Sequence, residues 1–284
     1  MTGSDGTLEM AFARRGDQSV LASLARRAPL IAQQALYWDA DLPGLPCVYM
    51  ITTSGCVLAG DRLSISISVG AGAMAHVTTQ AATKVHQMSA GLAEQSQRLT
   101  LEPDSYLELL PGPTIPHRHS RFVTRTEAVV ARSATLLYAE ILQPGRKYHG
   151  AGELFEYDLY SSALTARRPD GTGLFTEKLV AQPWLDPVRQ VGMMGLFDVF
   201  ANVTLVTRPC HADKIYERTA AGIDGQTGCM AGASRLPNDA GLVYKVLGGQ
   251  TEPVLAKVRE FWALTRHEVT GAPVPAARPW GPPL

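Results

Sequence analysis

The sequence predicts a mainly β protein with stacked or coiled β-sheets and about two α-helices, the clearer of them near the C-terminus. Short segments in which apolar and polar residues alternate recur at intervals of about ten residues, a spacing typical of all-β sandwiches and coils. Glycine (26 residues) and proline (19 residues) are plentiful, while charged residues make up 18% of the chain, below the usual quarter. This composition favours strands and turns over a helical bundle.

Residues 62–69 form the clearest predicted strand. Leu63, Ile65, Ile67 and Val69 alternate there with serines, so the strand has one apolar face and one hydroxyl face. Similar but noisier alternation predicts further strands, in chain order, at 8–14, 20–26, 48–52, 74–79, 97–101, 106–110, 122–130, 136–142, 154–164, 174–180 and 197–206.

The pattern changes near residue 208, which we interpret as a candidate subdomain edge within a single domain of residues 1–284. Beyond it the sequence predicts a short helix at 210–221 and two strands at 230–235 and 242–247.

The best helix of the chain is predicted to begin at Thr251 as the N-cap and to end at Gly271, which is followed by Pro273. Its apolar residues have the three- and four-residue spacing of a helix with one buried face; they are Val254, Leu255, Val258, Phe261, Trp262 and Val269. Residues 272–284 contain five prolines and predict an extended tail.

The charge balance excludes some classes of partner. Lys and Arg number 26 and Asp and Glu number 26, which removes the electrostatic case for nucleic acid or an anionic membrane surface. The longest apolar runs fall short of the roughly 18–20 residues that cross a bilayer. Four scattered cysteines without a CxxC pair, and no targeting segment at the start of the sequence, indicate a reducing, cytoplasmic location.

Motifs for enzymatic chemistry are sparse. The sequence has no GxSxG, HExxH, Walker A or GxGxxG motif. His117 and His119 are two residues apart, so on a strand they would share one face and offer two imidazoles to a divalent ion. A metal-dependent hydrolase built on this pair is one hypothesis; a polar turn after Pro116 is the other reading of the same residues.

Three carboxylates stand inside apolar extended stretches. Asp61 precedes the strand at 62–69, Glu140 lies in the run LLYAEIL, and Glu177 lies in LFTEKL. Burying an unpaired carboxylate costs several kcal/mol, so each should be exposed, paired or in contact with water. They either face outward from their strands or line a wet internal path that binds a divalent cation loosely.

A longer compound pattern begins at Asp61. A glycine-rich turn, GCVLAGDRL at 55–63, is followed by GAGA at 70–73 and TTQAATKV at 78–85. The pattern continues with QRL at 97–99, LELLP at 107–111, PTIP at 113–116, GR at 145–146, GE at 152–153, AGASRLP at 231–237 and the helix of Trp262. Over essentially its whole length, the chain resembles the urease accessory protein family UreD, also called UreH.

The resemblance implies a non-enzymatic maturation factor that binds apo-urease, UreF and, indirectly, UreG, and that helps to deliver nickel to the urease active site. It implies a predominantly β fold and a water-filled internal channel as the nickel route. The matching channel positions are the carboxylates Asp61, Glu140 and Glu177 and the hydroxyl of Thr83. No tightly bound cofactor is implied, because Ni²⁺ passes through transiently.

The chain also departs from the family pattern. The family usually has Pro-Gly-Gly before the turn and an aromatic residue after Lys-Val, where this chain has TSGC at 53–56 and His86. Cys56 and His86 are therefore candidate softer nickel ligands, or side chains that merely pack. The resemblance thins between residues 184 and 209, where partner contacts can differ. A docking adaptor that holds UreF on urease without conducting metal is the alternative function.

Overall fold

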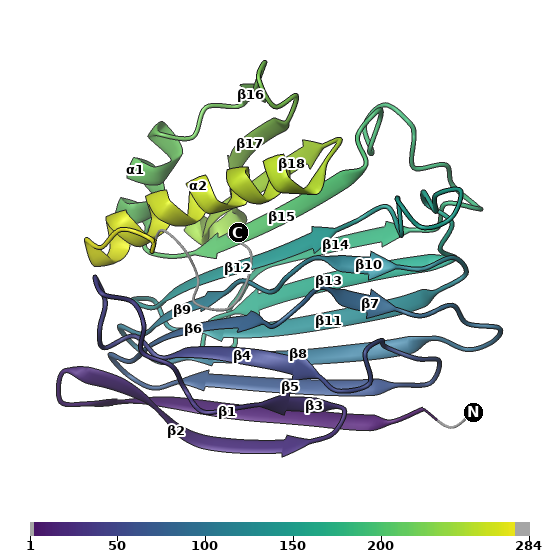
Figure 1. Cartoon of the computed structure of the whole chain (residues 1–284). Coiled ribbons are helices and arrows are strands. Elements are labelled where there is room, and N and C mark those ends of the chain that lie inside the picture. Colours follow the sequence, from purple (N-terminus) through teal and green to yellow (C-terminus); the bar gives the residue numbers. More distant parts are fainter. Residues whose placement is uncertain (1–2, 276–284) are drawn as a thin grey trace.

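The computed structural model describes residues 3–275, which form two β-sheets packed face to face and a layer of two α-helices on the outer face of the larger sheet (Figure 1). The mainly β fold class with a helix near the C-terminus is confirmed.

Within residues 3–275 the smaller sheet has seven strands. In spatial order they are β14 (Gly173–Ala181), β13 (Leu159–Arg167), β11 (Arg121–Val130), β8 (Ala93–Leu101), β5 (Arg62–Val69), β1 (Asp5–Arg15) and β2 (Gln18–Arg27). The larger, 11-stranded sheet runs β16 (Gly222–Ile223), β17 (Met230–Arg235), β18 (Gly241–Gly248), β15 (Val199–Val206), β12 (Thr135–Leu142), β9 (Tyr106–Leu109), β6 (Met74–Thr79), β4 (Cys47–Thr52) and β3 (Leu30–Ala32), with β7 (Thr83–Val85) and β10 (Thr114–Pro116) beside this path.

The chain coils, passing alternately through the two sheets. The strands β5, β8, β11 and β13 are parallel neighbours in the smaller sheet, and β4, β6, β9 and β12 are parallel neighbours in the larger one. Each turn of the coil places its residues in register with the previous turn, so that Ile65, Gln97 and Thr126 lie side by side. Each strand has one face inside the coil and one face outside it. Apolar and polar residues therefore alternate along the strand.

Two hydrophobic cores hold the layers together. The first fills the space between the sheets and includes Leu8, Ile67 and Leu99, each 0% exposed. The second lies between the outer face of the larger sheet and the helix α2 (Thr251–Thr270), with Val258 and Trp262 each 1% exposed. Burying a side chain of this size contributes about 1.5–3 kcal/mol.

Strand β12 belongs to both cores. Leu136 and Tyr138 face the space between the sheets, whereas Leu137 and Ile141 pack in the cluster under α2. All its residues except Glu140 are buried. A strand buried on both faces is apolar at nearly every position, which is why its sequence looks like an uninterrupted apolar run.

Most predicted strands are found, and the differences have local causes. The strands predicted at 62–69, 74–79 and 230–235 have these bounds in the structure. The strand predicted at 154–164 begins only at Leu159, because Phe155 adopts a left-handed backbone conformation (φ 59°) that interrupts an extended segment. The strands β3, β7, β10 and β16 are three residues or fewer, too short to carry a periodic signal.

Both helices differ from expectation at one end. The first helix, α1, spans Pro209–Glu217 and is shorter than the predicted 210–221. In α2 the N-cap is Gln250 and not Thr251, which already belongs to the helix. The predicted C-terminal end is confirmed, since Gly271 has the left-handed conformation (φ 77°) that glycine adopts readily. No helix within residues 3–275 combines the length and apolar character that a bilayer crossing requires.

Of the predicted tail at 272–284, residues 276–284 lie outside the described residues. The described part runs back along α2, where the carbonyl of Pro273 accepts a 3.4 Å hydrogen bond from Arg266. The strands on the two sides of residue 208 belong to one sheet, because β15 pairs with β18 along its length. The single-domain organisation stays a prediction.

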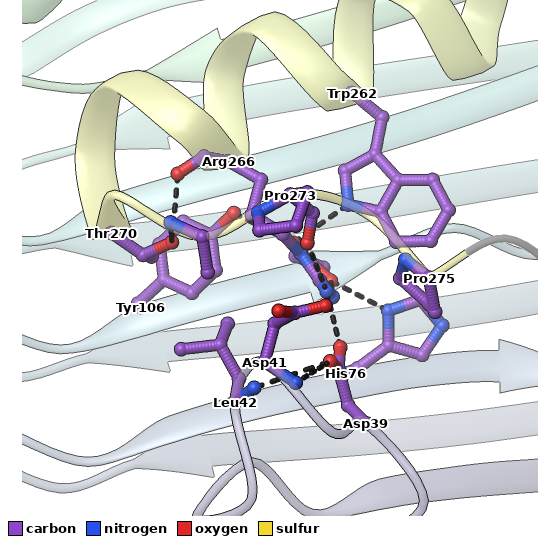
Figure 2. A network of polar contacts seen from close by, with 12 residues as sticks. Asp39, Asp41, Leu42, His76, Tyr106, Trp262, Arg266, Thr270, Pro273 and Pro275 are labelled. Carbon is purple, nitrogen blue, oxygen red and sulfur yellow. Dashed lines mark hydrogen bonds and ion pairs between the residues drawn. The ribbon is translucent and has the colours of Figure 1, made fainter.

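A buried polar network fixes α2 to the sheet (Figure 2). At its centre is the carboxylate of Glu108 on β9, which is 0% exposed. Arg266 of α2 donates to its two oxygens at 2.8 and 2.6 Å, and Trp262 donates at 2.6 Å. The hydroxyl of Tyr106 donates to Oε1 of Glu108 at 2.7 Å, and Nδ1 of His76 lies 2.7 Å from Oε2 of Glu108. Five contacts thus surround one buried charge.

The network keeps Glu108 ionised. Burial opposes the charged form, but the hydrogen bonds and positive charge of Arg266 outweigh it and hold the pKa of Glu108 well below its usual range. Because the folded pKa is lower than the unfolded value of about 4.3, this stabilisation is fully present above that pH and is lost as the pH falls through the folded pKa.

Replacing Arg266 with Met is expected to lower the free energy of unfolding by about 3–5 kcal/mol, because it leaves the buried Glu108 carboxylate without its cation. Chemical denaturation followed by circular dichroism measures the change. Arg125→Met is the control: Arg125 forms an exposed ion pair with Glu94, whose loss is expected to cost less than about 1 kcal/mol. Equal effects of the two substitutions would contradict the role of the network.

Candidate functional site

Two cavities lie between the sheets. The large cavity has a volume of about 290 Å³ and the small cavity about 60 Å³. Glu140 and Tyr160 line both cavities, so the two voids meet at these side chains. The combined space is large enough for several water molecules, and the polar lining gives them hydrogen-bond partners.

The strand register brings polar side chains to this part of the interior. On the larger sheet, Glu140 of β12 is in register with Asn202 of β15, which is in register with Lys245 of β18. On the smaller sheet, Glu177 of β14 pairs with the inward-facing Leu164 of β13. The rows face each other across the small cavity, which all of these residues line.

A chain of hydrogen bonds leads from the large cavity to Glu140. Gln97 donates to Thr126 at 3.1 Å and to the hydroxyl of Tyr138 at 3.2 Å. Tyr138 in turn donates to Oε1 of Glu140 at 3.1 Å, and Ser162 donates to the same oxygen. One oxygen of the carboxylate is therefore positioned by two hydroxyl groups.

Electrostatics make Glu140 unusual among the carboxylates. Burial raises its pKa, the hydroxyls of Ser162 and Tyr138 oppose the shift, and the negative charge of Glu177 adds to it. The side chain is thus held in a place where its ionised form is costly. A nearby cation would remove that cost.

The small cavity contains oxygens that lack partners. Glu177 forms an ion pair with Lys245 through Oε1, while its Oε2 is buried and has no hydrogen-bond partner within the described chain. Oδ1 of Asn202, a residue 5% exposed, is likewise buried and unpartnered among residues 3–275. Buried polar atoms of this kind are normally satisfied by water or an ion. A few oxygen ligands with retained water suit a loosely held divalent cation.

Asp61 lies elsewhere. Its side chain is 2% exposed and accepts hydrogen bonds from the backbone N–H groups of Leu58 and Ser4, both at 2.8 Å. It closes the glycine-rich turn and fastens that turn to the start of the chain, and it is not among the residues that line the two cavities. The structure brings Thr83, Cys56 and Glu140 to the large cavity and Glu140 and Glu177 to the small one.

The histidines pair differently from the prediction. Residues 117–120 form a turn in which His119 has a left-handed backbone (φ 56°), so His117 and His119 do not share a strand face. His119 bonds to Asp158 at 3.0 Å and stacks on Trp184, whereas His117 faces His86, with ring centroids 5.8 Å apart. The predicted hydrolase site built on His117 and His119 is therefore wrong. Within residues 3–275 no three His, Cys, Asp or Glu side chains cluster as a metal site.

Sequence reasoning missed most of the cavity wall. Gln97, Tyr138, Ser162 and Asn202 are ordinary polar residues in strands, and only the folded register brings them together. Lys245 carried a usable signal, because it is a charged residue between the apolar Tyr244 and Val246 of a strand, as Glu140 is in β12.

These observations define a class of protein: a two-sheet β-coil with polar cavities between its sheets. The chain belongs to the UreD urease accessory protein family, whose model matches residues 4–281. Proteins of this family are accessory to the maturation of urease and are not themselves the catalytic enzyme. The resemblance drawn from the sequence motifs is confirmed.

Related proteins match over almost the whole chain. Urease accessory protein UreD 2 of Brucella suis biovar 1 is 50% identical over 278 residues, which cover 98% of this chain and 92% of that protein. Urease accessory protein UreD of Photorhabdus laumondii subsp. laumondii is 49% identical, covering 98% of this chain and 87% of that protein. The corresponding protein of Yersinia pseudotuberculosis serotype O:1b is 48% identical with the same coverage.

Glu140→Gln is expected to raise the melting temperature at pH 7.5 relative to the unsubstituted chain. Because the folded pKa of Glu140 is raised, folding is penalised increasingly as the pH rises above the unfolded value of about 4.3, and Gln removes that penalty. The gain should therefore shrink when melting is measured at pH 4.5. Glu127→Gln, at an exposed position of the neighbouring sheet, is the control for losing one carboxylate. A pH-independent gain would show that burial of the charge is not the cause.

Proposed function

We propose that this chain is a cytoplasmic urease maturation factor that binds apo-urease together with UreF and, through UreF, UreG, and that helps to deliver nickel to the urease active site. In this proposal Ni²⁺ passes transiently through the two cavities and no cofactor is bound tightly. The observation that carries the proposal is the small cavity, where Glu140 and Glu177 meet beside buried oxygens that have no hydrogen-bond partner among residues 3–275.

The chemistry of the cavity favours passage over retention. Nickel would meet carboxylate, amide and hydroxyl oxygens and would keep part of its water shell, which gives weaker binding than a closed set of Cys and His ligands. Weak binding is required, because an ion held tightly at this point would not reach urease.

Lys245 gives the route a specific energetic feature. Its ammonium group pairs with Glu177, and its side chain is 51% exposed, so it lies between the small cavity and solvent. An arriving divalent cation can take the place of this ammonium at the carboxylate. Glu177 then exchanges one positive partner for another and is never left as an uncompensated buried charge.

Thr83 and Cys56 enter the proposal as part of the wall of the large cavity. Asp61 enters it as the residue that fixes the turn carrying Cys56, because both of its oxygens already accept backbone hydrogen bonds.

Glu140→Gln and Glu177→Gln are each expected to lower the nickel content of co-expressed urease on the order of tenfold, the scale of losing a group that positions a metal. Metal analysis of purified urease measures this effect. Co-purification with UreF should stay unchanged, which separates loss of conduction from loss of assembly. Glu127→Gln is the matched control on the outer face. Full nickel loading with both variants would exclude the route.

A second candidate function, the docking adaptor, is favoured by exposed apolar residues on two loops. Leu185, Val191 and Leu196 are 79%, 102% and 93% exposed, and Tyr148 on the adjoining loop is 79% exposed. The loops are joined through Asp198, which pairs with both Lys147 and Arg189. A cluster of exposed apolar side chains marks a surface for protein contact, and we assign it to another member of the urease assembly.

The triple substitution Leu185→Ser, Val191→Ser and Leu196→Ser is expected to abolish co-purification with UreF or apo-urease while leaving the melting temperature within about 2 °C, because these side chains bury little area in the free protein. Ile223→Ser is the control, since Ile223 is 66% exposed on strand β16, outside the two loops. Unchanged pull-down of both partners would exclude this surface. If the triple variant fails to activate urease while the two glutamine variants load nickel fully, the protein is an adaptor only.

A further inference from the structure

Three short segments lie side by side at the wall of the large cavity. Val57 forms a parallel bridge with Val85 of β7, and β7 pairs in parallel with β10, with Val85 opposite Pro116. Each strand of the β7–β10 pair is followed directly by a histidine, His86 and His117. The shared register brings the two imidazole rings together, with centroids 5.8 Å apart and ring planes inclined at 53°.

One ring nitrogen of His86 is available to a ligand. The carbonyl oxygen of Gln87 lies 3.0 Å from Nδ1 of His86. A carbonyl only accepts, so Nδ1 carries the proton and the lone pair of Nε2 is left available, which is the arrangement of most metal-binding histidines. His86 is exposed, so this nitrogen is accessible.

His117 is the buried half of the pair. It is 7% exposed, and its ring lies against that of His86. In its neutral form an imidazole has one unprotonated nitrogen, and this is the form that binds a metal ion.

The spacing fits one shared ion. An ion bound about 2.0–2.1 Å from each nitrogen lies roughly 3 Å from each ring centroid, so two rings on one ion stand at most about 6 Å apart. The observed separation of 5.8 Å is within this limit. A rotation of the exposed His86 side chain would narrow the angle between the two bonds.

We propose that His86 and His117 form a binding site for a divalent transition-metal ion, with water completing the coordination. The site lies directly beyond Thr83 and Lys84, which line the large cavity, so it is placed to load or unload that cavity. This inference rests on the proposed function only for the role of the ion as cargo, because the binding itself is a property of the two histidines.

The surrounding charges make the site weak. Lys84 and Arg146 both act on His117, and only Glu153 opposes them. Glu153 is itself paired with Arg146 at 2.8 Å. Two neutral ligands among mostly positive neighbours bind a divalent ion reversibly, and reversible binding is what a transfer point needs.

Titration of the full chain, without a polyhistidine tag and freed of metal by chelator, tests the proposal. Ni²⁺ binding is followed by calorimetry, and Co²⁺ binding by visible absorption, which reports nitrogen ligands directly. His86→Phe, which keeps a flat ring at an exposed position, is expected to weaken binding about tenfold or more. His117→Gln should do the same. His149→Phe, a change at another exposed histidine, should leave binding unchanged.

Wild-type affinity and an unchanged Co²⁺ spectrum in His86→Phe would overturn the site, whether or not His117→Gln folds. The same titration of Glu140→Gln separates this proposal from the nickel route. If that variant keeps the histidine signal and loads urease fully, the route fails and the histidine site stands. If it loads urease poorly while His86→Phe binds metal like the wild type, the route stands and the histidine site fails.

Discussion

A carboxylate inside a β-coil must find donors, a cation or water, and this requirement organises both interiors of the molecule. Glu108 and Glu140 stand on neighbouring strands, β9 and β12, but point into different layers. The first receives five polar contacts, two of them from an arginine. The second meets two hydroxyls, a like charge and a void. The carboxylate of Glu108 therefore has a full set of hydrogen-bond and charge partners, whereas that of Glu140 pairs with no cation among residues 3–275.

The two environments separate stability from function. The saturated network under α2 fixes the helix against the sheet and leaves no space for exchange. The cavity between the sheets keeps oxygens that have no partner within the described part of the chain, at a cost in stability that water or a bound cation would offset. Nickel delivery, as proposed, requires the cavity between the sheets to be supported by a rigid scaffold. The network under α2 provides that rigidity.

The sequence reveals those parts of this fold that depend on near neighbours in the chain. Alternation in β5 identifies a strand, and Gly271 identifies the end of α2, because both are local effects. The contact of Glu108 with Arg266 spans 158 residues and leaves no local trace. For the same reason the sequence predicts Asp61 in the cavity wall, whereas in the structure its carboxylate closes a turn. The sequence also pairs His117 with His119, whereas the ring of His117 faces His86, one turn of the coil away.

The double burial of β12 determines which layer feels a substitution in this strand. Its side chains alternate between two separately packed layers, so a change of volume at Leu137 must be absorbed by α2, and one at Tyr138 by the opposing sheet. The eight residues of β12 therefore contribute side chains to both packed layers. This strand is therefore a shared wall, and substitutions along it reach the helical layer from one face and the cavity between the sheets from the other.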